Sequence, residues 1–313
     1  MMSSPPTRLL GSTSVEVSEV GLGCNRIGED ILSDSGWIAL LNRAVDLGVT
    51  LFDTATLYAS GRSEELIGLA FGNRQDVTIA TKVLPSGDPK APRFSRKTVI
   101  EGAERSLRAL RRNCIDILQT HGGGALDEIC DPEWSKAMAL LKEQGKIRFR
   151  GSALFDAKGG IYAVENGLVD VLQVTYNLID VGHALPIIPV AEKYGVGLIA
   201  RMPYQRGILT GKFSSPEADA SSHRAHLQRE RFPADVLAAE QFRELGEGRP
   251  GGMPALAMQF VLAEKRISCT IPGARSIDQL EANLAAAAAP GLTEDEIKTI
   301  AEIQNDAQVR TSQ

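Results

Sequence analysis

The strongest constraint on the fold of this 313-residue chain is a regular alternation of short apolar runs with helical patterns. The runs are rich in apolar and β-branched residues, which is typical of buried strands. Eight of them occur along the sequence, at 17–22, 50–52, 77–81, 115–118, 148–152, 171–175, 197–200 and 269–271. Between them, apolar residues recur at three- and four-residue steps, which predicts helices over 37–47, 64–71, 97–110, 132–143 and 185–194.

Strand–helix alternation favours parallel strands joined by right-handed crossovers. Eight such units predict an α/β fold of the (β/α)8 TIM barrel type, and we expect residues 1–313 to form a single domain. The opening segment 8–17 predicts a β-hairpin with a Gly/Ser turn that plugs the barrel floor. Additional C-terminal helices are expected over 234–245, 254–264 and 292–304, the last with Thr293 as N-cap. The polar stretch 213–231 predicts a long loop after the seventh strand.

Composition excludes several kinds of partner. The net charge of −5 and the lack of any long basic block argue against nucleic acid. No apolar run approaches membrane-spanning length, and the N-terminus has no apolar core of a signal peptide, so we expect a cytoplasmic protein. The four cysteines lack metal-ligand or redox spacing, which predicts isolated thiols.

Four reactive side chains follow or end successive strands. Asp53 and Tyr58 come at and after the end of the second strand, Lys82 ends the third, and His121 ends the fourth. Because a barrel enzyme builds its active site at the carboxyl ends of its strands, we expect these side chains to meet. Taken singly, each has an ordinary structural interpretation: an Asp–Lys ion pair, a surface tyrosine, a histidine satisfied by the backbone.

Together, the four favour proton transfer. Tyrosine is a poor acid at its ordinary pKa of about 10. An ammonium from Lys82, held charged by Asp53, would favour the phenolate and lower that pKa. His121 could orient a carbonyl oxygen by hydrogen bonding or pass a proton. Tyr58 could then donate a proton to a carbonyl oxygen as that oxygen becomes negative.

Such a donor needs a hydride source, and because no protein side chain supplies hydride, the chemistry requires a cofactor. No Gly-x-Gly-x-x-Gly fingerprint joins a strand to a helix in this sequence. Instead, Ile271-Pro-Gly-Ala-Arg-Ser276 ends the eighth strand and opens a helix, where a phosphate could bind the helix N-terminus and Arg275. The structural alternative for this Pro-Gly is a simple turn.

These residues resemble those of the aldo-keto reductases over nearly the whole chain. The most specific match is the stretch 52–64, Phe-Asp-Thr-Ala followed by Tyr58 and Gly-x-Ser-Glu. The resemblance implies a catalytic tetrad of Asp53, Tyr58, Lys82 and His121, and NADP(H), or sometimes NAD, as cofactor.

The resemblance also implies a set of cofactor-binding residues. Ser152 and Gln173 would hold the nicotinamide carboxamide, and Gly207 to Lys212, after Arg201 and Pro203, would pass near the pyrophosphate. The end of the eighth strand, with Gly273, would continue the site, and the 2′-phosphate and adenine would contact three side chains: Arg275, Gln279 and Asn283.

Four positions depart from the family's common pattern. Ala153 stands where an asparagine is frequent, and Ala282 stands where a glutamate is frequent. Arg201 replaces a tyrosine that stacks on the nicotinamide, although an arginine can also lie flat against a ring. Finally, family members that act on hydrophobic carbonyls line their pocket with aromatic residues, and this chain has Asn25 and Gly122 at such positions. Only Tyr204 and Trp134 could still supply an aromatic wall. We therefore predict a polar pocket for an aldose or another small polar carbonyl.

Three alternatives remain open on sequence alone. One is an NAD-dependent sugar dehydrogenase on the same scaffold, because Arg275 could stack on adenine instead of binding a 2′-phosphate. A second is a cofactor-sensing regulatory subunit with weak turnover, like the barrel subunits of potassium channels. A third, a metal-dependent hydrolase, lacks an evident ligand set: His223 and His226 lie three apart without a third ligand, so we expect no metal. The oligomeric state is left open.

Overall fold

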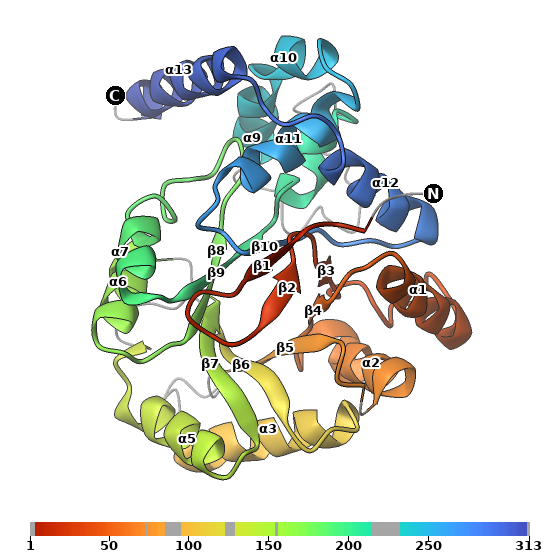
Figure 1. Cartoon of the computed structure of the whole chain (residues 1–313), viewed down its shortest axis with the longest axis vertical. Helices are drawn as coiled ribbons and strands as arrows, with labels where there is room; N and C mark the ends of the chain where they lie inside the picture. Colours follow the sequence, from red (N-terminus) through yellow and green to blue (C-terminus); the bar gives the residue numbers. More distant parts are fainter. Residues whose placement is uncertain are drawn as a thin grey trace.

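The computed structural model describes residues 4–72, 74–84, 95–122, 129–153, 156–213 and 232–311, with side chains described as far as residue 306. Eight parallel strands form a barrel in which sequence neighbours are also spatial neighbours (Figure 1). The strands are β3 (Leu22–Gly23), β4 (Leu51–Asp53), β5 (Thr78–Val83), β6 (Ile115–His121), β7 (Ile147–Ala153), β8 (Val171–Thr175), β9 (Gly197–Arg201) and β10 (Cys269–Ile271). The predicted α/β barrel is thus confirmed.

The barrel closes between its first and last strands. Parallel bridges join Val20 to Thr270 and Gly23 to Gly273, and the Gly21 amide donates to the Thr270 carbonyl at 2.8 Å. This seam requires small residues, because a Cβ added at Gly21 or Gly23 would lie 2.8 Å from a backbone oxygen of a neighbouring strand. The glycines therefore allow the close backbone approach that completes the cylinder.

Helices surround the barrel on its outer side (Figure 1). They are α1 (Asp34–Asp46), α2 (Arg62–Phe71), α3 (Arg96–Ala109), α5 (Pro132–Glu143), α6 (Ala157–Glu165), α7 (Ile187–Tyr194), α11 (Gly252–Ala263) and α12 (Ile277–Ala287). Several of these helices begin with an N-cap residue whose side chain accepts a hydrogen bond from a backbone amide of the first turn, as expected for serine and aspartate. These caps are Ser33, Ser95, Asp131, Asp156 and Ser276.

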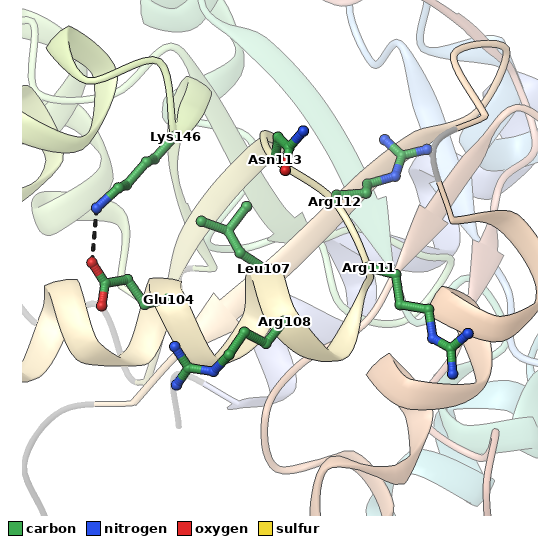
Figure 2. A pocket seen from close by; sticks show the side chains of 7 residues that line it. All are labelled: Glu104, Leu107, Arg108, Arg111, Arg112, Asn113 and Lys146. Atoms are coloured by element: carbon green, nitrogen blue, oxygen red, sulfur yellow. Dashed lines mark hydrogen bonds and ion pairs between the residues drawn. The ribbon is translucent and has the colours of Figure 1, made fainter.

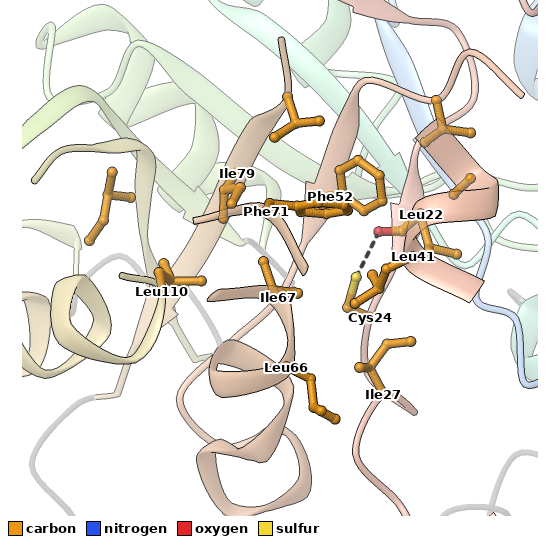
Figure 3. Close-up of a cluster of buried hydrophobic side chains, with 14 of the residues drawn as sticks. Leu22, Cys24, Ile27, Leu41, Phe52, Leu66, Ile67, Phe71, Ile79 and Leu110 are labelled. Atoms are coloured by element: carbon orange, nitrogen blue, oxygen red, sulfur yellow. Dashed lines mark hydrogen bonds between the residues drawn. The ribbon is translucent and has the colours of Figure 1, made fainter. Parts of the chain in front are cut away.

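Apolar faces of these helices pack on the outer faces of the strands. In Figure 3, Phe52 and Ile79 from the strands meet Ile67 and Phe71 from α2, and the Phe52 and Phe71 ring centroids lie 4.6 Å apart. Each such fully buried side chain stabilises the fold by roughly 1.5–3 kcal/mol. This packing fixes the height of each strand, and hence the position of the polar residues at the strand ends.

The N-terminal hairpin plugs the floor of the barrel, as predicted. Strands β1 (Thr7–Leu9) and β2 (Glu16–Ser18) pair antiparallel. Leu10, Val15 and Val17 are buried in one cluster with residues that point into the barrel, such as Leu51 and Ile199. The hairpin therefore closes the amino-terminal ends of the strands and leaves the carboxyl ends as the open mouth.

Three details of the predicted elements are corrected. The run 17–22 is not one strand: its start belongs to β2 of the hairpin and its end to β3 of the barrel, because the chain bends between the two. The expected helix 234–245 divides into α9 (Phe232–Glu240) and α10 (Arg243–Glu247). Helix α6 was not predicted, because two glycines interrupt its apolar pattern.

The C-terminal helix α13 (Glu294–Thr311) confirms the expected N-cap. The Glu296 amide donates to Thr293 Oγ1, and Glu296 accepts from the Thr293 amide.

The loop predicted over 213–231 lies outside the described residues except for Phe213. Within the described part of the chain, no helix is long and apolar enough to span a membrane.

Candidate active site at the barrel mouth

The mouth of the barrel holds a buried ion pair between two adjacent strands. Lys82 Nζ donates to Asp53 Oδ2 at 2.6 Å and to the Thr54 carbonyl at 2.9 Å. The two side chains are only 1% and 4% exposed. Lys82 Nζ also donates a third, longer hydrogen bond to the Tyr58 hydroxyl, at 3.4 Å. The ammonium thus joins the acid and the phenol that the sequence placed five residues apart.

The second carboxylate oxygen of Asp53 is also held. Gln173 Nε2 donates to Asp53 Oδ1 at 2.7 Å, and Gln119 Nε2 donates to the same oxygen at 3.2 Å. Gln119 was not singled out by the sequence analysis. It lies two residues before His121 on one strand, and the period-two rule that points both side chains to the same face could have identified it.

Tyr58 reaches the ion pair from a strained turn. The short 3-10 helix η1 (Tyr58–Gly61) contains Ala59 and Ser60 at φ 47° and 56°, followed by Gly61 at φ 92°. Left-handed conformations are costly for residues other than glycine and cluster at functional sites. The Tyr58 ring lies against His121, edge to face, with ring centroids 5.6 Å apart.

Burial shifts the pKa values of these groups. Burial raises the pKa of Tyr58 above its ordinary value, even though the Lys82 charge acts in the opposite direction. Our sequence expectation of a lowered tyrosine pKa is therefore wrong for this structure, because burial of the ring outweighs the ammonium. Burial would lower the pKa of Lys82, but Asp53 and Tyr58 outweigh it, and the net pKa is raised. The pKa of His121 falls to about 4 through burial and the Lys82 charge.

Arg201 and Ser152 also lie toward the carboxyl ends of their strands. Arg201 ends β9, donates from Nε to Thr175 Oγ1 at 3.1 Å, and its charge acts on Tyr58 and His121. Burial lowers the pKa of Arg201 to about 10, which leaves the guanidinium protonated at neutral pH. Ser152 is fully buried near the end of β7 and shares a hydrogen bond with the Thr120 hydroxyl.

The remaining predicted residues lie in two places, one after β10 and along α12, the other in and beside the short helix η2 (Gln205–Thr210). Gln279 and Asn283 lie four residues apart on one face of α12, and Arg275 lies in the turn just before the helix. The Arg275 amide donates to Gln279 Oε1, and Asn283 Nδ2 donates to the Gly273 carbonyl. Gly207 lies in η2 at φ 94°, between Pro203 and Lys212.

A network of buried polar side chains connects η2 to its neighbours. Asn177 Nδ2 donates to Gln205 Oε1, and Gln205 Nε2 donates to Asp235 Oδ2 on α9. Met202, Gln205 and Arg206 all have positive φ. The Gln205 side chain thus ties this unusual conformation to Asn177, after β8, and to Asp235 on α9.

A comparison with known proteins agrees with this geometry. Residues 19–305 match the model of the aldo/keto reductase family. The chain belongs to that family. It is 31% identical to an uncharacterized oxidoreductase, YqkF, of Bacillus subtilis over 299 residues, which covers 94% of each chain. It is 30% identical to L-galactose dehydrogenase of Arabidopsis thaliana over 297 residues, covering 91% of this chain and 89% of the relative.

Solved structures show the same fold. The aldo-keto reductase AKR11C1 of Bacillus halodurans, in its holo form, superposes with a TM-score of 0.77 at 28% identity, covering 97% of this chain and 96% of the other. An oxidoreductase activity of the aldo-keto reductase type follows from this membership.

Of the two aromatic candidates for the pocket of this aldo-keto reductase, Trp134 does not reach the mouth. Trp134 lies fully buried on α5, in the hydrophobic cluster outside the barrel, so it cannot line the mouth. Tyr204 precedes η2 and packs partly against the same cluster. Asn25 is exposed after β3, Gly122 follows β6, and the other two glycines of that run lie outside the described residues.

One open pocket lies far from this chemistry. An open depression of about 490 Å³ lies at the carboxyl end of α3, at the opposite end of the barrel from the mouth. In Figure 2, Lys146 reaches Glu104 across it, while Arg111 and Arg112 point away from that pair.

Within the described ranges, no group of three His, Cys, Asp or Glu side chains could hold a metal, and His223 and His226 lie outside those ranges.

Proposed function

We propose that this chain interconverts a carbonyl and an alcohol with NADP(H), acting on CH–OH donors with NAD(P) as acceptor in the oxidative direction, and that Tyr58 is the proton donor. The observation that carries the proposal is the 3.4 Å contact between the Tyr58 hydroxyl and Lys82 Nζ, at the mouth of an aldo-keto reductase barrel. The nicotinamide cofactor would supply the hydride.

The protein side chains provide the proton chemistry. Because burial raises the pKa of Tyr58, its hydroxyl is protonated at neutral pH and can donate. The Lys82 ammonium would stabilise the phenolate that forms, and Asp53 keeps that ammonium charged and in place. His121 is neutral at pH 7, since its pKa is about 4, and an imidazole N–H can bond the carbonyl oxygen.

The residues at the mouth fit such a cofactor. The first turn of α12 offers backbone amides directly after Arg275 in the chain, and such amides together with a guanidinium would bind a phosphate. Gln279 and Asn283 on the same face would contact the adenine end, with Gly207, Lys212 and Gly273 near the phosphates. Ser152 and Gln173 would hold the carboxamide, and Arg201 would lie against the ring beside Pro203.

Replacement of Tyr58 by phenylalanine tests the proton donor. Tyr58→Phe should keep its affinity for NADPH and lose on the order of 10²-fold or more in kcat, as expected for a missing general acid. The measurement is NADPH oxidation with a panel of aldehydes, aldoses and ketones, together with NADPH titration by fluorescence. Undiminished turnover by the phenylalanine variant would dismiss Tyr58 as the donor.

Replacement of Arg275 tests the cofactor preference. Arg275→Ala should weaken NADPH binding by about 10- to 100-fold and NADH binding far less, because a hydrogen bond to a charged group contributes roughly 1.5–3 kcal/mol. Equal losses for the two cofactors would instead favour adenine stacking. The second candidate, an NAD-dependent sugar dehydrogenase, would then gain support, in line with the L-galactose dehydrogenase among the relatives.

A small polar carbonyl, such as an aldose, is our proposed substrate. Asn25 is exposed after β3, and Gly122 follows β6 without a side chain, so both positions would suit a small polar substrate. The same panel decides between substrates: turnover confined to hydrophobic aryl ketones would contradict a polar pocket.

A further inference from the structure

The turn that carries Tyr58 is conformationally costly. Three consecutive residues after Tyr58 adopt left-handed backbone conformations, and two of them are not glycine. Such a turn persists only where the surrounding structure enforces it. Helix α2 begins at once after it, and its N-cap, Gly61, has no side-chain cap to hold the first turn. The constraint on the turn must therefore come from elsewhere.

The second and third residues of α2 provide two buried anchors. Ser63 is fully buried, donates to the Cys24 carbonyl at 3.0 Å, and shares a 2.8 Å hydrogen bond with the Thr54 hydroxyl. Glu64 is 3% exposed and accepts a 2.6 Å hydrogen bond from the Thr81 hydroxyl. A buried carboxyl group in a helix facing a barrel wall is unusual, and burial raises its pKa.

Both anchors attach to the neighbours of the ion pair. Thr54 follows Asp53 directly, and its carbonyl also accepts from Lys82. Thr81 precedes Lys82 directly. The start of α2 is thus tied to both strands that hold the ammonium, and Tyr58 is tied to the start of α2 by a short strained turn.

We propose that Ser63 and Glu64 are positioning residues that set the distance between the Tyr58 hydroxyl and Lys82 Nζ through hydrogen bonds to Thr54 and Thr81. The inference rests on the proposed role of Tyr58 as proton donor. Misplacement of a reacting group by 1 Å can cost about 10²-fold in rate. Loss of either anchor should therefore lower kcat while cofactor binding is retained.

The test uses three variants that remove one anchor each, Ser63→Ala, Glu64→Ala and Thr81→Val, and one conservative variant, Glu64→Gln. The first three should lose about 10-fold or more in kcat, with the Kd for NADPH changed by less than about 2-fold. Glu64→Gln should keep most of the activity, because its amide oxygen can still accept from Thr81. If Glu64→Ala does not fold, the nearly isosteric Thr81→Val removes the same bond from the other side.

Ser18→Ala is the matched control for lost stability. It removes a buried hydroxyl that bonds Thr50 at the barrel floor, far from Tyr58. It should lower Tm without lowering kcat. If the anchor variants lower Tm as Ser18→Ala does and leave kcat unchanged, the inference is overturned.

A double-mutant cycle separates this inference from the proposed function. In a Tyr58→Phe background, Glu64→Ala should have little further effect on kcat, because the hydroxyl that it positions is gone. A fully additive loss would contradict the positioning role. If Tyr58→Phe alone is fully active, the proposed function fails; if Tyr58→Phe is inactive but the anchor variants are active, only this inference fails.

Discussion

Two buried ion pairs stand at opposite ends of the same wall of the barrel, and only one belongs to the candidate active site. At the mouth, Lys82 bonds Asp53 at 2.6 Å. At the floor, Arg112 bonds Asp116 at 2.9 Å, also with both side chains almost fully buried. The two pairs have similar lengths and burial, so neither property explains their different roles.

The difference lies in the remaining partners. Arg112 also donates to backbone carbonyls of Gly72, Arg74 and Val77, and Asp116 accepts from the Ile79 amide and from Arg148. Apart from the Arg148 guanidinium, these partners are backbone groups, so the floor pair holds the corner before β6 in place. Lys82 instead reaches the Tyr58 hydroxyl, which can change its protonation state. A buried ion pair therefore points to chemistry only when its next partner can exchange a proton.

The largest effect on activity is expected at the mouth pair. Lys82→Met should lower kcat on the order of 10²-fold or more, because the phenolate loses the charge that stabilises it. The rate should fall with little change in Kd for NADPH, measured by steady-state kinetics and fluorescence titration. A Lys82→Met variant with normal kcat would remove the distinction drawn between the two ends of the barrel.

The floor pair should affect stability instead. Arg112→Met leaves three backbone carbonyls without this donor and removes one partner of a buried carboxylate, which typically costs 3–5 kcal/mol. Because Arg148 still pairs with Asp116, we expect a loss of about 3 kcal/mol in the free energy of unfolding. Urea titration measures this loss, and kcat of the folded variant should equal that of wild type. A large fall in kcat would show that the floor pair also acts on the mouth.

The smallest effect concerns pH. The His121 pKa is about 4 in the folded chain, below the ordinary value of 6.5, so between these values the unfolded chain binds more protons. Its contribution to stability is therefore lost as the pH falls from 6.5 toward 4. His121→Gln should flatten the decrease of the free energy of unfolding over this range, measured by urea titration at several pH values. An unchanged slope would mean that the histidine is not buried as described.

Sequence pattern predicted the barrel, the hairpin plug and most of the helices, because strand and helix periodicities are local. The pattern did not predict features that depend on how the elements pack in the folded chain. The run 17–22 was predicted as one strand. In the structure, the chain passes from the hairpin to the barrel wall inside this run. Trp134 was one of two aromatic candidates for the pocket, but its position on α5 buries it in the cluster outside the barrel.

For the site, the sequence predicted that Asp53, Lys82 and His121 end successive strands, and the structure brings their side chains together around Tyr58. Their catalytic roles stay predictions, as do the single domain over 1–313 and the cofactor contacts of Arg275, Gln279 and Asn283. The sequence did not predict that Gln119 and Gln173 share one oxygen of Asp53, because that contact joins strands far apart in the chain.

The sequence alone determined which chemical groups reach the barrel mouth, since a residue that ends a parallel strand has its place fixed by local periodicity. Only the tertiary structure decided the protonation of those groups and the placement of the tyrosine. The pKa of Tyr58 depends on burial by residues distant in sequence, and its turn is held by hydrogen bonds from α2 to two strands. Desolvation and such long-range hydrogen bonds exist only after the chain has folded.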